Sequence, residues 1–142
     1  EAVPVGTIGG TYCRNAVSCA AALKAIEFME QHHLDQRAVE IGNKVMSRYK
    51  KMKEKYEAVG DVRGLGSMIG IEFVKDKDSK EPDPDLVKSL IQECVQNGLL
   101  VESAGIYGNV IRFLAPLVIT DEQLEAGLDI LEKAVAKFSK EK

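Results

Sequence analysis

The residue best suited to chemistry is Arg112, which lies within the apolar stretch VIRFL. An unpaired charge buried among such residues would be costly. If this stretch is a strand, the Arg112 side chain points away from the face shared by Ile111 and Phe113, and it could simply reach solvent. Alternatively, its guanidinium could hold a carboxylate through two parallel hydrogen bonds. The residues alone leave both interpretations open.

A second candidate is the stretch GGTYCRN at residues 9–15, directly ahead of a helical pattern. Gly9 and Gly10 would let backbone N–H groups come close to a phosphate oxygen, and the Thr11 hydroxyl could donate to one. The same residues would also suit an ordinary loop that enters a helix. As a bare pattern, the stretch favours the ordinary loop.

The sequence gives little support to a nucleophilic, nucleotide-binding or metal site. No serine or cysteine has a histidine base at a familiar spacing, and there is no dinucleotide-binding glycine motif or P-loop. The three cysteines, Cys13, Cys19 and Cys94, form no CxxC pair, which argues against a disulfide framework or a zinc site and fits a reducing cytoplasm. His32 and His33 are adjacent, so on a helix they diverge by about 100° and cannot chelate one metal.

The composition indicates one soluble globular domain. The chain has 142 residues, of which 45% are hydrophobic and 29% charged, with a net charge of -3. An acidic balance gives no basic surface for nucleic acid. No apolar run approaches the roughly 18 residues that span a membrane, and there is no signal-peptide pattern. We therefore expect a cytoplasmic protein with neither nucleic acid nor membrane as a partner.

The first half of the chain predicts two helices. Asn15 is a candidate N-cap for a helix over residues 16–34, which is rich in small and apolar residues. Asp35 can cap a second helix. The expected core stripe of that second helix consists of Ala38, Ile41, Val45, Tyr49, Met52 and Tyr56.

Residues 60–76 change to the alternating period of a strand, with Ile69, Ile71 and Phe73 on one face. The opposite face consists of Met68, Gly70, Glu72 and Val74. The glycines Gly60, Gly64 and Gly66 indicate turns or a bulge. Asp61 and Arg63 could form a pair within a site, but an ion pair that stabilises a turn is the favoured interpretation.

The second half predicts a helix, two strands and a final helix. Pro82 and Pro84 begin the first of these helices, whose core stripe would be Leu86, Val87, Leu90, Ile91 and Cys94, and Asn97 and Gly98 end it. Strands are expected at residues 99–103 and, after a turn at 107–109, at 108–116. The segment TDEQ at 120–123 matches a capping box, and Leu124, Leu128, Leu131, Val135 and Phe138 of the last helix should face inward. This order predicts an α+β fold in which helices cover one face of a small, mainly antiparallel sheet.

Three stretches of the chain together resemble one known family. They are GGTY followed by NAVSCAAALKAIEFME, then VGDVRGLGSMIGIEFV, then CVQNGLLVESAGIYGNVIRFLAPLVITDEQLEAGLDILEKAV. In this order they resemble the C-terminal part of the class III aminotransferases, which are fold-type I enzymes dependent on pyridoxal 5'-phosphate. The resemblance covers residues 9–135, and within the family it is greatest to the 4-aminobutyrate aminotransferases.

The resemblance implies specific roles for the two candidates. In the family, the threonine of GGT reaches across the dimer to the cofactor phosphate of the neighbouring subunit, which assigns phosphate binding to Thr11 with Gly10. The arginine of the strand motif GN-x-[IL]-R binds the substrate carboxylate, which corresponds to Arg112. The reaction implied moves an amino group from an amine-bearing donor to an oxo-acid acceptor, in a homodimer or a larger assembly.

The chain departs from the family pattern in two ways. Cys13 and Arg14 stand where the family usually has glycines, and Ala16 where it usually has proline, so contacts after Thr11 could differ. The Schiff-base lysine of the family lies before GGT, and none of the ten residues before Thr11 is a lysine. We therefore expect a C-terminal fragment, inactive alone. Residues 1–14 would be the tail of the cofactor domain with the phosphate-contact loop, and residues 15–142 the C-terminal small domain with its leading helices.

Two alternatives remain. Another class III member, such as an acetylornithine or ornithine aminotransferase or an amino-acid racemase, would share these motifs, because substrate discrimination in the family lies largely upstream. A non-catalytic interaction or oligomerisation module would instead use the alanine-rich helix at 16–34 and the loop that enters it.

Overall fold

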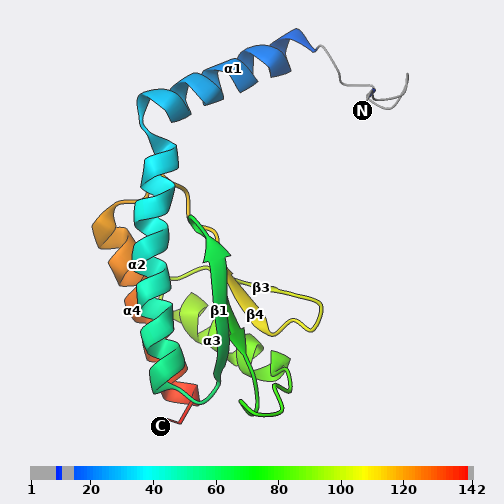
Figure 1. Cartoon of the computed structure of the whole chain (residues 1–142), viewed down its shortest axis with the longest axis vertical. Helices are drawn as coiled ribbons and strands as arrows, with labels where there is room; N and C mark the ends of the chain where they lie inside the picture. Colours follow the sequence, from blue (N-terminus) through cyan, green and yellow to red (C-terminus); the bar gives the residue numbers. More distant parts are fainter. Residues whose placement is uncertain (1–8, 11–14, 141–142) are drawn as a thin grey trace. The chain divides into compact units, whose positions relative to one another are not determined.

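The structure is a computed structural model that describes residues 9–10 and 15–140. Its contacts divide the chain into two compact units, Glu1–Asp35 and Gln36–Lys142. The element order along the chain is two helices, a pair of strands, a helix, a second pair of strands and a final helix (Figure 1). The sheet and three of the four helices of this described part lie essentially within the second unit.

The first unit contains α1 (Ala16–Gln31). Asn15 begins this helix as expected, because its side chain accepts a hydrogen bond from the Ser18 amide at 3.0 Å. No residue of α1 is buried, and its large apolar side chains are exposed, namely Val17, Leu23, Ile26, Phe28 and Met29. Cys19 is also exposed, although its place on an apolar face of this helix predicts that it packs in a core, and that prediction is wrong here.

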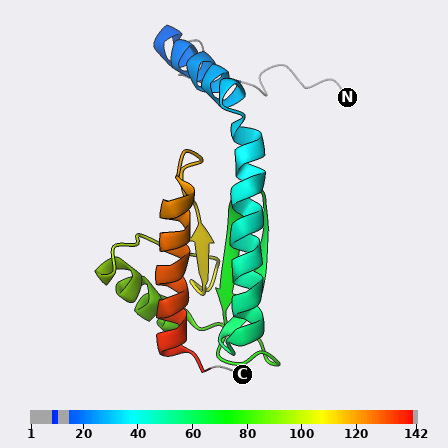
Figure 2. The same ribbon diagram turned by 90° about the vertical axis from the view of Figure 1, so that its left-hand side faces the viewer.

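In the second unit, α2 (Leu34–Lys55) and α4 (Asp121–Phe138) lie side by side (Figure 2). Ion pairs join them: Arg37 and Lys44 both contact Asp121, and Arg48 contacts Asp129 and Glu132. The expected capping box at the start of α4 is present, with Thr120 and Gln123 bonded reciprocally. Helix α3 (Pro84–Gln96) begins at the N-cap Asp83, whose side chain accepts from the Leu86 amide.

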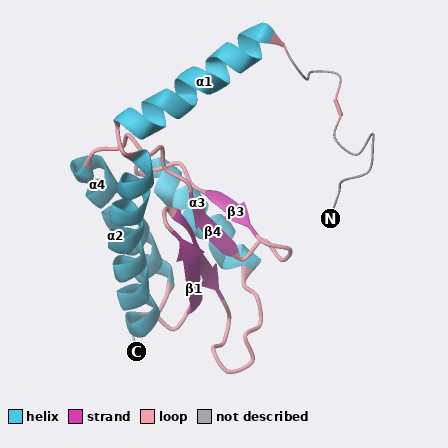
Figure 3. Cartoon of the chain, turned by 45° about the horizontal axis from the view of Figure 1, so that its top comes forward, coloured by secondary structure: helices cyan, strands magenta, loops and turns pink. Residues whose placement is uncertain are grey.

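The sheet has four antiparallel strands in the order β1-β2-β4-β3 (Figure 3). Strands β1 (Val59–Leu65) and β2 (Met68–Phe73) form a hairpin, so the glycines at 60–66 belong partly to a strand, with an irregularity between Val59 and Asp61. Strands β3 (Glu102–Ala104) and β4 (Val110–Phe113) form the second pair. The α+β fold predicted from the sequence is confirmed.

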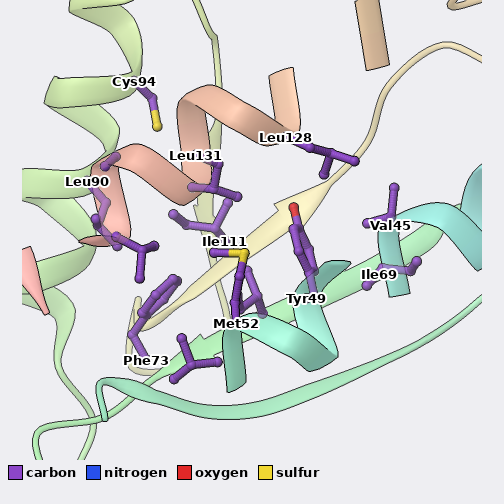
Figure 4. Packing of buried hydrophobic residues seen from close by; sticks show 14 of the residues in the cluster. Val45, Tyr49, Met52, Ile69, Phe73, Leu90, Cys94, Ile111, Leu128 and Leu131 are labelled. Atoms are coloured by element: carbon purple, nitrogen blue, oxygen red, sulfur yellow. The ribbon is translucent and has the colours of Figure 1, made fainter. Parts of the chain in front are cut away.

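The core lies between the helices and one face of the sheet (Figure 4). Ile69, Ile71 and Phe73 of β2 are fully buried, as their alternation predicted. The predicted stripes of the helices meet them, chiefly through Ile41, Val45, Tyr49 and Met52 of α2, Val87, Leu90 and Cys94 of α3, and Leu124, Leu128, Leu131 and Val135 of α4. One apolar face per element is therefore enough to form a single core.

Four local predictions differ from the structure. Asp35 lies in the first turn of α2, which begins at Leu34, and so is not its N-cap. Pro82 precedes the start of α3, where Pro84 is the first residue. Strand β3 begins at Glu102, later than predicted, since residues 99–101 do not pair. Phe138 is 43% exposed and so does not face inward with the other residues of its stripe.

Candidate functional site

Arg112 lies on an interior strand of the sheet. Strand β4 pairs with β2 on one side and β3 on the other, and the register places Arg112 opposite Gly70 of β2 and opposite Glu102 of β3. Its neighbour Ile111 is fully buried in the core. The alternation of a strand therefore directs the Arg112 side chain to the face of the sheet that the helices of its unit do not cover.

The guanidinium of Arg112 is available to a ligand. Its side chain is 46% exposed, and the nearest acidic group, the Glu102 carboxylate, lies 3.8 Å from Nη2. That distance is longer than a hydrogen bond. Among the described residues, no hydrogen bond involves the Arg112 side chain, so its donors can pair with the two oxygens of an incoming carboxylate.

Arg63 on the same face is occupied by its neighbours. Its Nη1 contacts Glu72 at 2.5 Å and Asp61 at 3.1 Å, and Lys53 contacts Asp61 at 3.0 Å. Hydrogen bonds from Lys53 and then Arg63 lower the pKa of Asp61. The expected Asp61–Arg63 ion pair is present, although it lies along strand β1 rather than in a turn. The two positive charges of this cluster, on Lys53 and Arg63, balance the two negative charges, on Asp61 and Glu72, so we assign the cluster a structural role.

Sequence reasoning missed Asn109, the one buried polar residue of the described chain, which is 4% exposed. It directly precedes β4, and its side-chain amide donates to the Phe73 carbonyl at 2.9 Å. This bond connects the start of β4 to the end of β2 and so positions the strand that carries Arg112. A signal was available, since asparagine after glycine is typical of a turn at the start of a strand.

An apolar groove of about 410 Å³, lined in part by Arg112 and Glu102 themselves, lies between α4 and the segments that contain β3 and β4. Its lining includes Leu99, Leu114, Pro116 and Leu128. Such a surface suits an apolar side chain rather than a charged group. We therefore restrict the candidate carboxylate site to the uncovered face of the sheet.

The predicted phosphate-contact loop lies only partly within the described residues. Gly10 belongs to the described residues and is exposed, whereas Thr11, Cys13 and Arg14 lie outside them. Gly10 and Arg112 also belong to different units of the chain. The geometry of the candidate site therefore rests on Arg112 and its sheet neighbours.

The described residues contain no group of three or more histidine, cysteine, aspartate or glutamate side chains arranged to hold a metal ion. Within the same residues, no helix has the length and apolar character needed to cross a membrane.

Comparison with known proteins identifies relatives over nearly all of the chain. The chain is 44% identical over 132 residues to a protein of Bacillus subtilis named probable 4-aminobutyrate aminotransferase, and 41% identical over 133 residues to the 4-aminobutyrate aminotransferase of Escherichia coli. A leucine/methionine racemase of Thermococcus litoralis is 45% identical over 126 residues. These alignments cover 93%, 94% and 89% of this chain, but only 30%, 31% and 28% of the relatives.

Solved structures agree with the fold. An amine transaminase from an uncultivated Pseudomonas species matches 94% of this chain with a TM-score of 0.82 and 31% identity, and the match covers 30% of that structure. The chain thus spans about 30% of the length of its relatives. The model of the family named aminotransferase class-III matches residues 1–135. The similarity of fold and the match of the sequence thus agree that this chain belongs to the class III aminotransferase family.

Proposed function

We propose that this chain is the carboxylate-binding part of an aminotransferase that transfers an amino group from 4-aminobutyrate to 2-oxoglutarate. One observation carries the proposal: Arg112, in the strand motif GNVIR, presents on the uncovered face of the sheet a guanidinium that forms no hydrogen bond with the described residues and lies 3.8 Å from the Glu102 carboxylate. The identity to 4-aminobutyrate aminotransferases of two bacteria supports the choice of donor.

In this proposal Arg112 binds and orients the acid. Its planar guanidinium forms two parallel hydrogen bonds with the carboxylate and fixes the direction of the substrate. Because β4 is paired on both sides, the backbone that carries Arg112 is already positioned before the acid arrives. Arg112 thus supplies affinity and orientation.

The cofactor of the proposed enzyme is pyridoxal 5'-phosphate, which when bound supplies the electron sink that the transfer of an amino group requires. Gly10 and Thr11 would hold its phosphate in the neighbouring subunit of a homodimer. Gly9 and Gly10 fit this role, because both are exposed and a Cβ on Gly9 would meet no described atom within 4 Å. Their backbone is therefore accessible to an anion.

The 142-residue chain by itself should have no transaminase activity. The lysine to which the family attaches its cofactor precedes the GGT motif, and residues 1–10 contain no lysine. A purified sample of this chain that consumed 4-aminobutyrate would contradict the proposal.

The test of the arginine role uses the full-length enzyme. Arg112→Ala should weaken the apparent affinity for 2-oxoglutarate by about 2–5 kcal/mol, the usual cost of losing one partner of a hydrogen-bonded charge pair. Arg63→Ala is the matched control, because it removes an arginine from the same face that is already paired with Glu72. Equal affinities in Arg112→Ala and the wild type would refute the carboxylate-binding role.

The racemase relative supplies a second candidate, because its identity to this chain is as high as that of the aminotransferases. An amino-acid racemase inverts one amino acid and consumes no oxo acid. The full-length enzyme is therefore incubated with amino donors, with and without 2-oxoglutarate. Formation of glutamate only when 2-oxoglutarate is present supports the aminotransferase.

A further inference from the structure

Gly70 occupies the middle of β2, an interior strand of the sheet. Glycine weakens a strand there, because it loses more backbone entropy than other residues and offers no side chain to pack. A glycine at such a position indicates a bulge, a special backbone angle or the close approach of another group.

The backbone does not require glycine at position 70. Gly70 is not among the glycines with positive φ, and its pairing with Arg63 and Arg112 is regular. A Cβ added there would meet one described atom within 4 Å, Cγ1 of Val110 at 3.1 Å. A small movement of that methyl group would accommodate an alanine. By contrast, a Cβ on Gly64 would collide with the carbonyl oxygen of Met68.

The neighbours of Gly70 explain the missing side chain better. One row across the uncovered face of the sheet consists of Arg63, Gly70, Arg112 and Glu102, each on a different strand. Side chains directly opposite one another in such a row lie about 5 Å apart. Arg112 therefore has a carboxylate on one side and, on the other, a position without a side chain that Cγ1 of Val110 borders.

The position beside Arg112 that lacks a side chain suits an anion. The guanidinium of Arg112 has N–H donors without a hydrogen-bond partner in the described chain, because the carboxylate paired with it, that of Glu102, lies 3.8 Å away. On the far side of Gly70, the positive charge of Arg63 is matched by Glu72 and Asp61. A carboxylate that approaches Arg112 from the side of Gly70 therefore meets an arginine whose charge is already neutralised. An approach from the side of Glu102 would meet a negative charge, which would repel it.

We propose that Gly70 is a specificity-determining residue, whose missing side chain leaves the gap through which the substrate carboxylate reaches Arg112. The proposal rests on the carboxylate-binding role of Arg112 and adds the direction and the size limit of the approach. A side chain at position 70 would narrow this gap and leave the strand pairing intact.

The experiment uses the full-length enzyme with Gly70→Ala and Gly70→Val. Glutarate, an unreactive dicarboxylate, serves as the binding probe in isothermal titration, and KM and kcat are measured for 2-oxoglutarate. We expect glutarate affinity to fall in the order wild type, Ala, Val, by roughly tenfold or more for Val. KM should rise in parallel while kcat stays within about twofold, because the gap controls access and binding rather than the reacting atoms. Gly127→Ala on α4 is the glycine control and should leave affinity unchanged.

Two comparisons separate the possible failures. Arg112→Ala is titrated in parallel: if it loses affinity while both Gly70 variants bind glutarate like the wild type, the inference about Gly70 is wrong and the role of Arg112 stands. If Arg112→Ala itself binds normally, the proposed function fails. The double variant Gly70→Ala with Val110→Ala removes the 3.1 Å contact. Recovery of wild-type affinity in that variant would assign the effect to displaced Val110 and overturn the inference, whereas persistent weakening supports it.

Discussion

Asn109 and Phe73 bond to each other twice. The Phe73 amide donates to the Asn109 carbonyl at 2.8 Å, and the Asn109 side chain donates to the Phe73 carbonyl at 2.9 Å. The pair joins the end of β2 to the residue before β4, three positions ahead of Arg112. It therefore fixes the register on which the candidate site depends.

Replacing Asn109 should destabilise the chain. Asn109→Ala removes a buried hydrogen bond, which should lower the free energy of unfolding by about 1–2 kcal/mol in urea titration. Asn109→Asp should cost more near neutral pH, because a carboxylate would face the Phe73 carbonyl. The pKa of that new carboxyl group would be raised in the folded state. The loss in free energy of unfolding relative to the wild type should therefore grow as the pH rises above about 4. Asn43→Ala, at an exposed position of α2, is the control and should cost little.

The ion pairs of Asp121 should make stability depend on pH. Hydrogen bonds from Lys44 and then Arg37 lower the pKa of Asp121 below 3.8. A lowered folded-state pKa contributes stability that is complete above the unfolded pKa and is lost as the pH falls through the folded pKa. Asp121→Asn should therefore destabilise the chain at neutral pH, and its difference from the wild type should shrink below pH 3.8. In a Lys44→Gln background the substitution should cost less. A pH-independent difference would contradict this account.

The thiols should differ in reactivity. Burial, with a contribution from Glu93, raises the pKa of Cys94 to about 11, whereas Cys19 is exposed. Only the thiolate reacts with iodoacetamide, so at a pH of about 8 the native chain should be alkylated at Cys19 and spared at Cys94. Peptide mass mapping reads both sites, and concentrated urea should make Cys94 reactive. Rapid native labelling of Cys94 would show that the contact of α3 with the core opens readily.

Two glycines on helices should respond differently to substitution by alanine. A Cβ on Gly42 of α2 would collide with the Gly66 carbonyl oxygen in the turn between β1 and β2. Gly42→Ala should thus cost about 1–3 kcal/mol in spite of the higher helix propensity of alanine. A Cβ on Gly127 of α4 would lie 3.4 Å from Leu99, which is ordinary contact, so Gly127→Ala should be neutral or gain up to about 1 kcal/mol. Thermal denaturation of the two variants compares them directly.

The sequence predicted the features that depend on neighbouring residues. Asn15 and the Thr120–Gln123 box were found because capping acts within one turn of helix. The buried face of β2 followed from simple alternation. Strand β1 was harder to predict, because its glycines and charges resemble a loop and it becomes a strand through pairing with β2.

The sequence could not predict which residues surround Arg112. Its face followed from its position next to Ile111, but its neighbours Gly70 and Glu102 depend on the register of three strands. Register is a non-local property that a period of two leaves open. The same holds for Asn109, whose partner Phe73 is 36 residues away in the chain. The phosphate role of Thr11 stays a prediction, since that residue lies outside the described part.

The pairing of β4 on both sides bears on the thermodynamics of recognition. An arginine on a free loop would pay for ordering both its backbone and its side chain whenever an acid bound. Arg112 extends from a backbone that hydrogen bonds already fix, so mainly side-chain rotamer freedom, worth about 2 kcal/mol, remains to be lost. If Arg112 binds the acid as proposed, binding should therefore show a small entropic penalty and little protection of new amides from hydrogen exchange. Most of the conformational entropy of this backbone is therefore lost when the sheet forms during folding, before any acid binds.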